Sequence, residues 1–266
     1  MNLFNKYQYQ WQTVSYLKKY LLLLSIAFLQ TTYLYSATFY AKGISLSKVS
    51  FLVWILSSFQ DISTAVHGFP FIYCLLLVIL FKDHQINELI IQRFNSSKDI
   101  KLNKLMVIIS NSLFFVLGID FISIIFSYFP FGKFFSLTKE GDAFFFRNFN
   151  QHLLSNYSLA IQVAHSSALA FFYFVLLGLI FWGTTILVKK KSVGFIVNII
   201  FIIMQAAIFR KQTKSSFISP INHYILYLNK NRAAAALFMY DLFYWLLLIT
   251  VLTVIIWHLD NRKGVI

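Results

Sequence analysis

Long apolar runs recur along the whole chain, and short polar or charged stretches separate them. A helix of about 20 apolar residues is long enough to cross a hydrocarbon core. Backbone polar groups in lipid must be satisfied within the segment, so these runs predict helices. The pattern predicts an all-α, polytopic integral membrane protein with one transmembrane domain over residues 1–266 and six spans, at about 21–40, 62–81, 105–128, 163–188, 193–209 and 237–258.

The second apolar region, from Val49 to Phe81, is longer than one ordinary span requires. Asp61, Gly68 and Pro70 interrupt it. We interpret residues 62–81 as the second span, and residues 49–60 as a re-entrant piece, an interfacial piece or part of that span. Pro70 predicts a kink, because its ring nitrogen cannot donate a hydrogen bond to the preceding turn.

The first twenty residues differ from the spans, because their apolar residues are spaced by three and four with polar residues between them. This spacing predicts an amphipathic helix over residues 1–20 that lies in the plane of the membrane interface. A polar tail is the alternative. The apolar positions are Leu3, Tyr7, Trp11, Val14 and Leu17.

Composition and charge agree with a membrane protein. The chain has 266 residues, of which 59% are hydrophobic and 12% charged, whereas a soluble domain carries about twice that charged share. The net charge of +14 does not indicate nucleic-acid binding, because Lys and Arg lie at the ends of apolar runs, where they anchor helices at headgroups. The single Cys74 lies inside an apolar run, so no disulfide forms within the chain.

Basic residues also predict the orientation. An even number of spans puts both termini on one side of the membrane. Thirteen of the 23 Lys and Arg residues lie on that side, which favours cytoplasmic termini by the positive-inside rule. The basic segment from Arg210 to Arg232, on the other side, disagrees with this orientation.

Enzyme signatures are absent from the sequence. It holds no phosphate-binding loop, no nucleophile elbow and no HExxH zinc motif, and its six histidines have no metal-ligand spacing. We therefore expect neither an enzyme nor a metal site. Polar and ionisable groups are costly in lipid and usually have a partner or a function there. Asp120 and Asn111 therefore form a candidate intramembrane polar site. A helix-packing hydrogen bond is the alternative, and it is favoured for Asp241 and His165 near span ends.

The polar stretch between the second and third predicted spans contains one further element. Asp83 is placed to cap a short amphipathic helix from His84 to Phe94, in which Ile86, Leu89, Ile90 and Arg93 share a side. A helix between two spans is a feature that a cytoplasmic partner could bind in order to move both spans. An ordinary interfacial helix is the alternative.

Two runs in this region carry a family resemblance, FPFIYCLLLVILFKD at 69–83 and NELIIQRFNSSKDIKLNKL at 87–105. With the order of elements, they resemble the permease subunit of bacterial ABC transporters of the ABC-2 (type V exporter) kind. In that family an arginine, a small polar turn and a lysine before the third span form the ATPase-coupling helix. Arg93, Ser96, Ser97 and Lys104 match this pattern, while Ile100 stands where the family often has an aromatic residue.

The resemblance implies a permease subunit of an ATP-driven exporter in the bacterial cell membrane, moving a peptide, lipid or other hydrophobic or amphipathic compound. It implies a cytoplasmic ATPase subunit that holds ATP and Mg, a second permease copy or a related permease, and no cofactor in this chain. The coupling residues would be Asn87, Glu88, Ile90, Ile91 and Arg93. A non-transporting protein for bacteriocin immunity or sensing is the alternative. A secondary transporter would need a second intramembrane charge to match Asp120.

Overall fold

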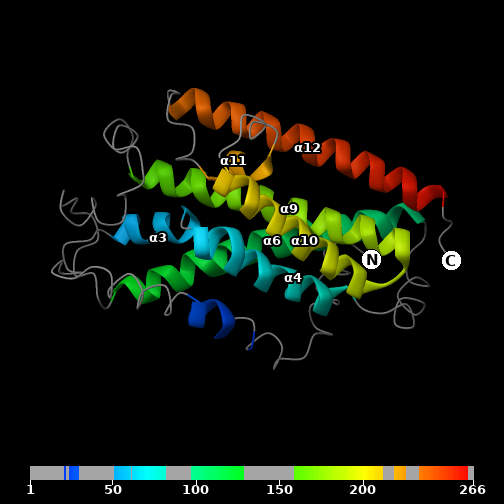
Figure 1. Cartoon of the computed structure of the whole chain (residues 1–266), viewed down its shortest axis with the longest axis horizontal. Coiled ribbons are helices and arrows are strands. Elements are labelled where there is room, and N and C mark those ends of the chain that lie inside the picture. Colours follow the sequence, from blue (N-terminus) through cyan, green and yellow to red (C-terminus); the bar gives the residue numbers. More distant parts are fainter. Residues whose placement is uncertain are drawn as a thin grey trace.

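The computed structural model describes residues 21, 24–29, 51–60, 62–81, 97–128, 159–211, 219–225 and 234–262. Every regular element within these residues is helical, which confirms the all-α class (Figure 1). The elements are α3 (Phe51–Gln60), the π-helix η2 (Ile62–Gly68), α4 (Phe69–Leu80), α6 (Ser97–Tyr128), α9 (Leu159–Val188), α10 (Lys191–Lys211), α11 (Pro220–Tyr224) and α12 (Ala234–Arg262).

Four of these helices are long and apolar enough to cross a membrane, as expected of an integral membrane protein. They are α6, α9, α10 and α12, with apolar stretches at 98–125, 160–188, 191–208 and 239–260. Of the other two predicted spans, the first is described only at residues 21 and 24–29, and the second contains a shorter apolar helix, Thr64–Ile79. The count of six spans therefore stays a prediction.

The region predicted as an interfacial or re-entrant piece and a second span folds as three helical elements. Ile55, Leu56 and Phe59 of α3 are buried, and α3 packs against α6 and α9. Pro70 lies in the first turn of α4, directly after η2 ends, and Gly68, the last residue of η2, has a helical backbone. The change from π-helix to α-helix thus falls beside the proline, whose ring nitrogen has no N–H to donate to the preceding turn. The kink at Pro70 stays a prediction.

Helix α6 begins at Ser97, eight residues before the predicted start of the third span. Three lysines, Lys98, Lys101 and Lys104, therefore lie inside the helix and not in a loop. Lysine is a good helix former, and its long side chain can hold the ammonium group near water while the stem lies on apolar surface. A prediction from hydropathy alone starts the helix after Lys104, and so it misses the turns that contain the three lysines.

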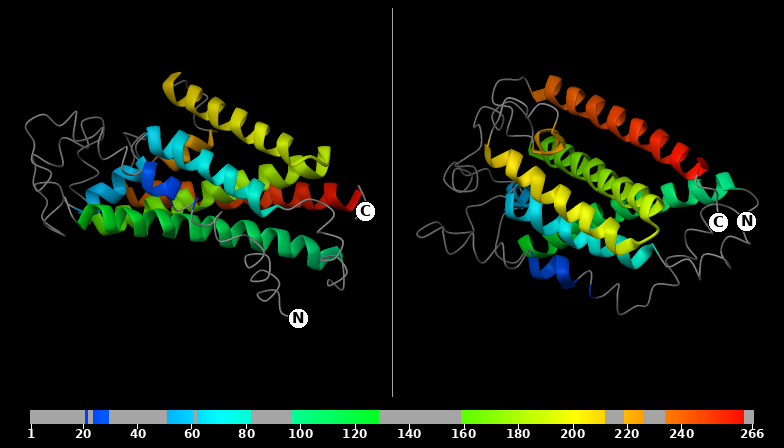
Figure 2. Two further views of the ribbon diagram at one scale, coloured as in Figure 1. Left: turned by 90° about the horizontal axis from the view of Figure 1, so that it is seen from below. Right: turned by 45° about the vertical axis from the view of Figure 1, so that its right-hand side comes forward.

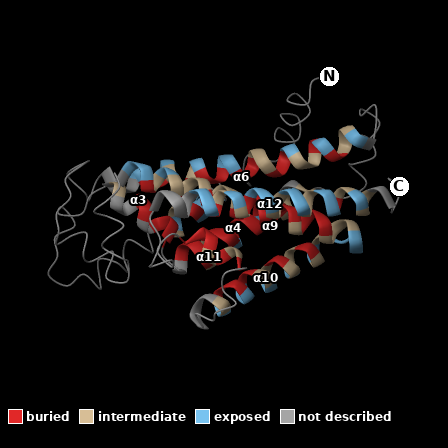
Figure 3. Ribbon diagram, turned by 90° about the horizontal axis from the view of Figure 1, so that it is seen from above, coloured by how far each residue is buried: buried red, intermediate tan, exposed pale blue. Residues whose placement is uncertain are grey.

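Helix α9 lies at the centre of the bundle and packs against α3, α6, α10 and α12. Figure 3 shows its buried residues beneath helices whose outer faces are exposed. The core around it is aromatic: the rings of Phe115 and Phe174 lie 5.0 Å apart, and that of Tyr73 lies 5.0 Å from Phe174. Helices α6 and α9 pack tightly at Gly178, where an added Cβ would meet the side chain of Ile108.

The helices run antiparallel in a way that gathers basic residues at one end of the bundle (Figure 1, right). We call this the basic end, and the other the opposite end. The described helix ends there, together with the turn between α9 and α10, contain Lys98, Lys101, Lys104, Lys189, Lys190, Lys191 and Arg262. Those at the opposite end contain only Arg210 and Lys211.

Two residues, Lys189 and Lys190, separate α9 from α10. Lys189 has a φ of 59°, and its N–H donates to the carbonyl of Thr185 at 2.8 Å. A residue in this left-handed conformation terminates many helices. The two helices consequently form a tight antiparallel hairpin, visible in the right-hand view of Figure 2.

Candidate functional site

The predicted coupling residues, Asn87, Glu88, Ile90, Ile91 and Arg93, lie outside the described residues, as does the predicted interfacial helix over 1–20. The nearest described residues on either side of the coupling segment are Phe81, after α4, and Ser97, at the start of α6. Both belong to helix ends at the basic end of the bundle (Figure 1).

The two residues of the predicted intramembrane polar site do not come together. Asp120 accepts a hydrogen bond from Ser167 Oγ of α9 at 3.2 Å. Asn111 donates from Nδ2 to the carbonyl of Val107, one turn back in its own helix, at 2.6 Å. Asp120 comes nine residues after Asn111 in α6, so the two lie about 14 Å apart along the helix axis.

Asp120 instead belongs to a set of polar contacts around the start of α9. Beside Ser167, the Ser166 Oγ accepts a hydrogen bond from Gln60 Nε2 of α3 at 2.9 Å, and both of these residues are buried. Adjacent serines on α9 therefore bond two different helices, α3 and α6. Because a buried polar group is costly unless it is bonded, these contacts fix how the three helices face one another.

A second set of contacts holds the short helix α11 between α10 and α12. Gln205 of α10 accepts at Oε1 from Ser219 Oγ at 2.6 Å and from the backbone N–H of Ile221 at 3.2 Å. Pro220, in the first turn of α11, has no N–H to satisfy. One buried glutamine thus bonds the start of α11, where helical N–H groups have no partner within the helix.

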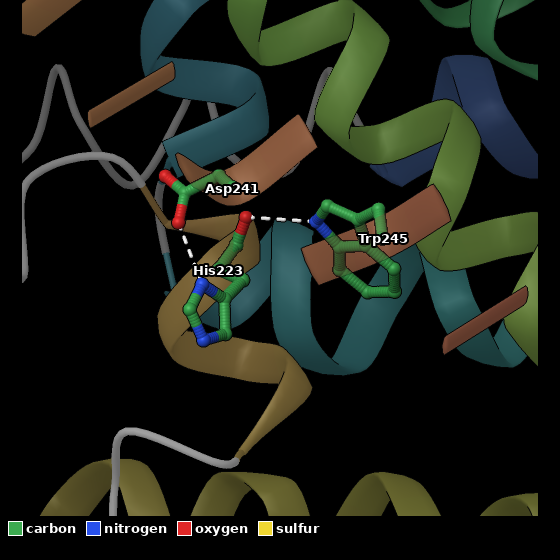
Figure 4. A network of polar contacts seen from close by, with 3 residues as sticks. All are labelled: His223, Asp241 and Trp245. Atoms are coloured by element: carbon green, nitrogen blue, oxygen red, sulfur yellow. Dashed lines mark hydrogen bonds and ion pairs between the residues drawn. The ribbon is translucent and has the colours of Figure 1, made fainter. Parts of the chain in front are cut away.

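A buried polar contact between two ionisable side chains joins α11 to α12. His223 Nδ1 and Asp241 Oδ1 lie 2.6 Å apart, and the two residues are 2% and 0% exposed (Figure 4). Trp245 Nε1 donates to the backbone carbonyl of His223 at 3.0 Å. A carboxyl group and an imidazole at this distance share one hydrogen bond whichever of them carries the proton.

Aromatic rings surround this pair. The His223 ring stacks on Tyr244 with centroids 3.7 Å apart and an interplanar angle of 18°. Tyr224 stacks on Tyr173 of α9 at 4.9 Å and 12°. Burial raises the pKa of the Tyr224 hydroxyl well above its usual range, and the nearby Tyr173 raises it further. The Tyr224 hydroxyl therefore stays protonated, and burial shields His223 and Asp241 from water.

These contacts lie at similar depth, and we call them the polar layer: Gln60, Asp120, Ser166, Ser167, Gln205, Ser219, His223 and Asp241. Its members on α6, α9, α10 and α12 lie within eight residues of the helix ends at the opposite end, or within roughly 12 Å of them. The polar layer thus crosses the half of the bundle away from the lysines. The arrangement can hold helices in one packing and can hold a proton.

The polar layer is mostly invisible in the sequence. Asp241 stood out only as a residue near a span end, and His223 lay in a segment interpreted as a polar loop. The one available signal was Pro220 followed by an apolar and aromatic stretch within that segment. Among the described residues, no group of three or more His, Cys, Asp or Glu side chains could hold a metal ion.

Comparison of the chain with known protein families, curated proteins and solved structures finds no match. Function is therefore inferred from the residues of this chain and their arrangement.

Proposed function

We propose that this chain is the membrane-spanning permease subunit of an ATP-driven ABC exporter of the ABC-2 kind in a bacterial cell membrane. It crosses the membrane six times, with both termini cytoplasmic and with residues 21–40 and 62–81 as the two further spans. A separate ATPase subunit holds ATP and Mg and acts on a pair of permeases. The cargo is a peptide, a lipid or another hydrophobic or amphipathic compound.

The observation that carries this proposal is where the two described helix ends that flank the predicted coupling segment lie. In sequence the segment joins α4 to α6, and the end of α4 and the start of α6 both lie at the basic end of the bundle. The positive-inside rule assigns an end rich in lysine to the cytoplasm. A cytoplasmic ATPase would therefore meet the segment from 84 to 94 on the side of the membrane where ATP is present.

The polar layer supports a transport role at the other side of the bundle. An exporter alternates between two packings of its helices, and a partner's closure on ATP supplies the rigid-body movement. Such a movement must break and remake buried polar contacts. The hydrogen bonds from α9 to α3 and α6, and from α11 to α10 and α12, lie where an outward-facing opening would form.

Co-purification tests the coupling segment. The chain, carrying an affinity tag, is expressed with the candidate ATPase encoded beside it, and the amount of ATPase retained is measured. Ile90→Ala combined with Arg93→Ala removes an apolar contact and a charge from one side of the expected helix. We expect retention to fall at least about tenfold, the effect of losing 1.4 kcal/mol, with unchanged membrane insertion.

Gln92→Ala is the matched control, because Gln92 points away from Ile90 on a helix. Its retention of the ATPase should equal that of the unaltered chain. Undiminished binding by the double variant contradicts the coupling assignment. Failure of the unaltered chain to retain any ATPase contradicts the exporter proposal itself and favours the non-transporting immunity or sensing protein.

A further inference from the structure

Three lysines lie along one side of the first turns of α6, at the basic end. Lys98, Lys101 and Lys104 are spaced by three, which brings successive side chains within reach of each other on a helix. Lys101 is 1% exposed and Lys104 is half-buried. Two ammonium groups one turn apart repel each other, and the Asp260 carboxylate of α12 attracts Lys104, so the balance of charge over the whole basic end decides whether a further anion binds.

Tryptophans from two other helices lie under these lysines. Lys101 Nζ is 5.6 Å from the ring centroid of Trp257 on α12, and Lys104 Nζ is 6.0 Å from that of Trp182 on α9. An ammonium group over an indole face gains a cation–π attraction. The two ammonium groups are thus held between three helices, a few turns from the helix ends at the basic end.

The charge around them is strongly positive. Lys189, Lys190 and Lys191 follow α9 at the same end, and the described carboxylates there are Asp99 and Asp260. Six lysines with two carboxylates leave a clear excess of positive charge. A phosphate fits this surface, because lysine is a common phosphate ligand and basic pockets between spans on the cytoplasmic side bind phospholipid headgroups.

We propose that the start of α6, with Trp182 of α9 and Trp257 of α12, binds a phosphate group of an anionic ligand. Lys101 and Lys104 are its principal ligands. The phosphate belongs either to the headgroup of an anionic phospholipid or to free phosphate. This site does not depend on the exporter proposal, because no ATPase takes part in it.

The test uses the full chain in phosphatidylcholine nanodiscs, with increasing phosphatidylglycerol in one arm and increasing inorganic phosphate in the other. Thermal stability reports binding in both arms, and native mass spectrometry counts retained phosphatidylglycerol. We expect saturable stabilisation in at least one arm. If only phosphatidylglycerol stabilises the chain, the ligand is a lipid headgroup. If inorganic phosphate stabilises it, the site binds the free ion. No stabilisation in either arm overturns the proposal.

Lys101→Gln combined with Lys104→Gln should weaken apparent affinity about twenty-fivefold, from about a factor of five for each lysine. Lys189→Gln combined with Lys190→Gln removes the same charge from exposed side chains, and solvent screening should keep its effect below about threefold. Equal losses in the two double variants overturn the proposal, because they show general attraction to a basic surface. If the first double variant does not fold, Lys104→Gln alone replaces it, and an unaltered affinity is then the contrary result.

Discussion

The two ends of the bundle bury polar groups by different means. At the basic end, Lys101 and Lys104 lie over the indoles of Trp257 and Trp182, close to helix termini. In the polar layer, His223 and Asp241 bond each other across two helices and are almost fully buried. A lysine near a helix end can extend toward water, whereas a buried carboxyl group depends on its partner. The first arrangement leaves two charged groups near the ends of helices, and the second fixes the packing of helices.

The largest expected effect comes from breaking the buried pair. His223→Leu leaves Asp241 without its imidazole partner, while the bond from Trp245 to the backbone of residue 223 is kept. We expect the free energy of unfolding to fall by about 3–5 kcal/mol, and replacement of both residues by leucine to recover most of it. Denaturant unfolding of the detergent-solubilised chain measures both variants.

His258→Leu is the control, since His258 is exposed on the same helix, α12. Its effect should stay within about 0.5 kcal/mol. If His223→Leu and Asp241→Leu prove additive in the double variant, the two residues are not coupled. The buried pair would then not fix the packing of α11 against α12, and the difference drawn between the two ends of the bundle would be wrong.

A smaller effect is expected at the tight contact between α6 and α9 at Gly178, between the two ends. Gly178→Ala places a methyl group against Ile108, so α6 and α9 must move apart or repack, at a cost of about 1–3 kcal/mol. Gly118→Ala is the matched control, because an added Cβ meets nothing within 4 Å. It should stabilise α6 by about 0.5–1 kcal/mol. Thermal unfolding compares the two, and an equal response would contradict the close packing of these helices.

The smallest effect belongs to the turn at the basic end. The backbone of Lys189 is left-handed. This conformation costs a residue with a side chain about 1 kcal/mol of stability, whereas it costs glycine almost nothing. Lys189→Gly should therefore raise the free energy of unfolding by up to about 1 kcal/mol. Lys190→Gly, at a neighbour without a positive φ, should lower it or leave it unchanged. A loss of stability in Lys189→Gly would contradict the observed turn.

Hydropathy predicted the long helices well. Helices α9, α10 and α12 begin and end within four residues of the predicted spans, because each apolar run is closed by polar residues. It failed at the start of α6, where lysines continue the helix. Helix α11 was missed because five residues are too few for a periodic pattern.

The candidate sites were predicted less completely than the helices. Asp120 was singled out from the sequence as a polar residue within an apolar helix. Its partner Ser167 lies 47 residues away, and no sequence pattern connects them. The contact between His223 and Asp241 needs α11 to fold back between α10 and α12. A contact of this kind forms only when the helices pack together, so it cannot be predicted from the local spacing of apolar residues. The coupling segment remains a prediction, because residues 84–94 lie outside the described part of the chain.

The short turn at Lys189 and Lys190 has a mechanical consequence. It joins the end of α9 to the start of α10, and the 30 residues of α9 make that helix about 45 Å long. One end of this hairpin lies among lysines, and near its other end it carries Ser166, Ser167 and Gln205. If the hairpin tilts as a unit about the basic end, the largest displacement falls on the polar layer.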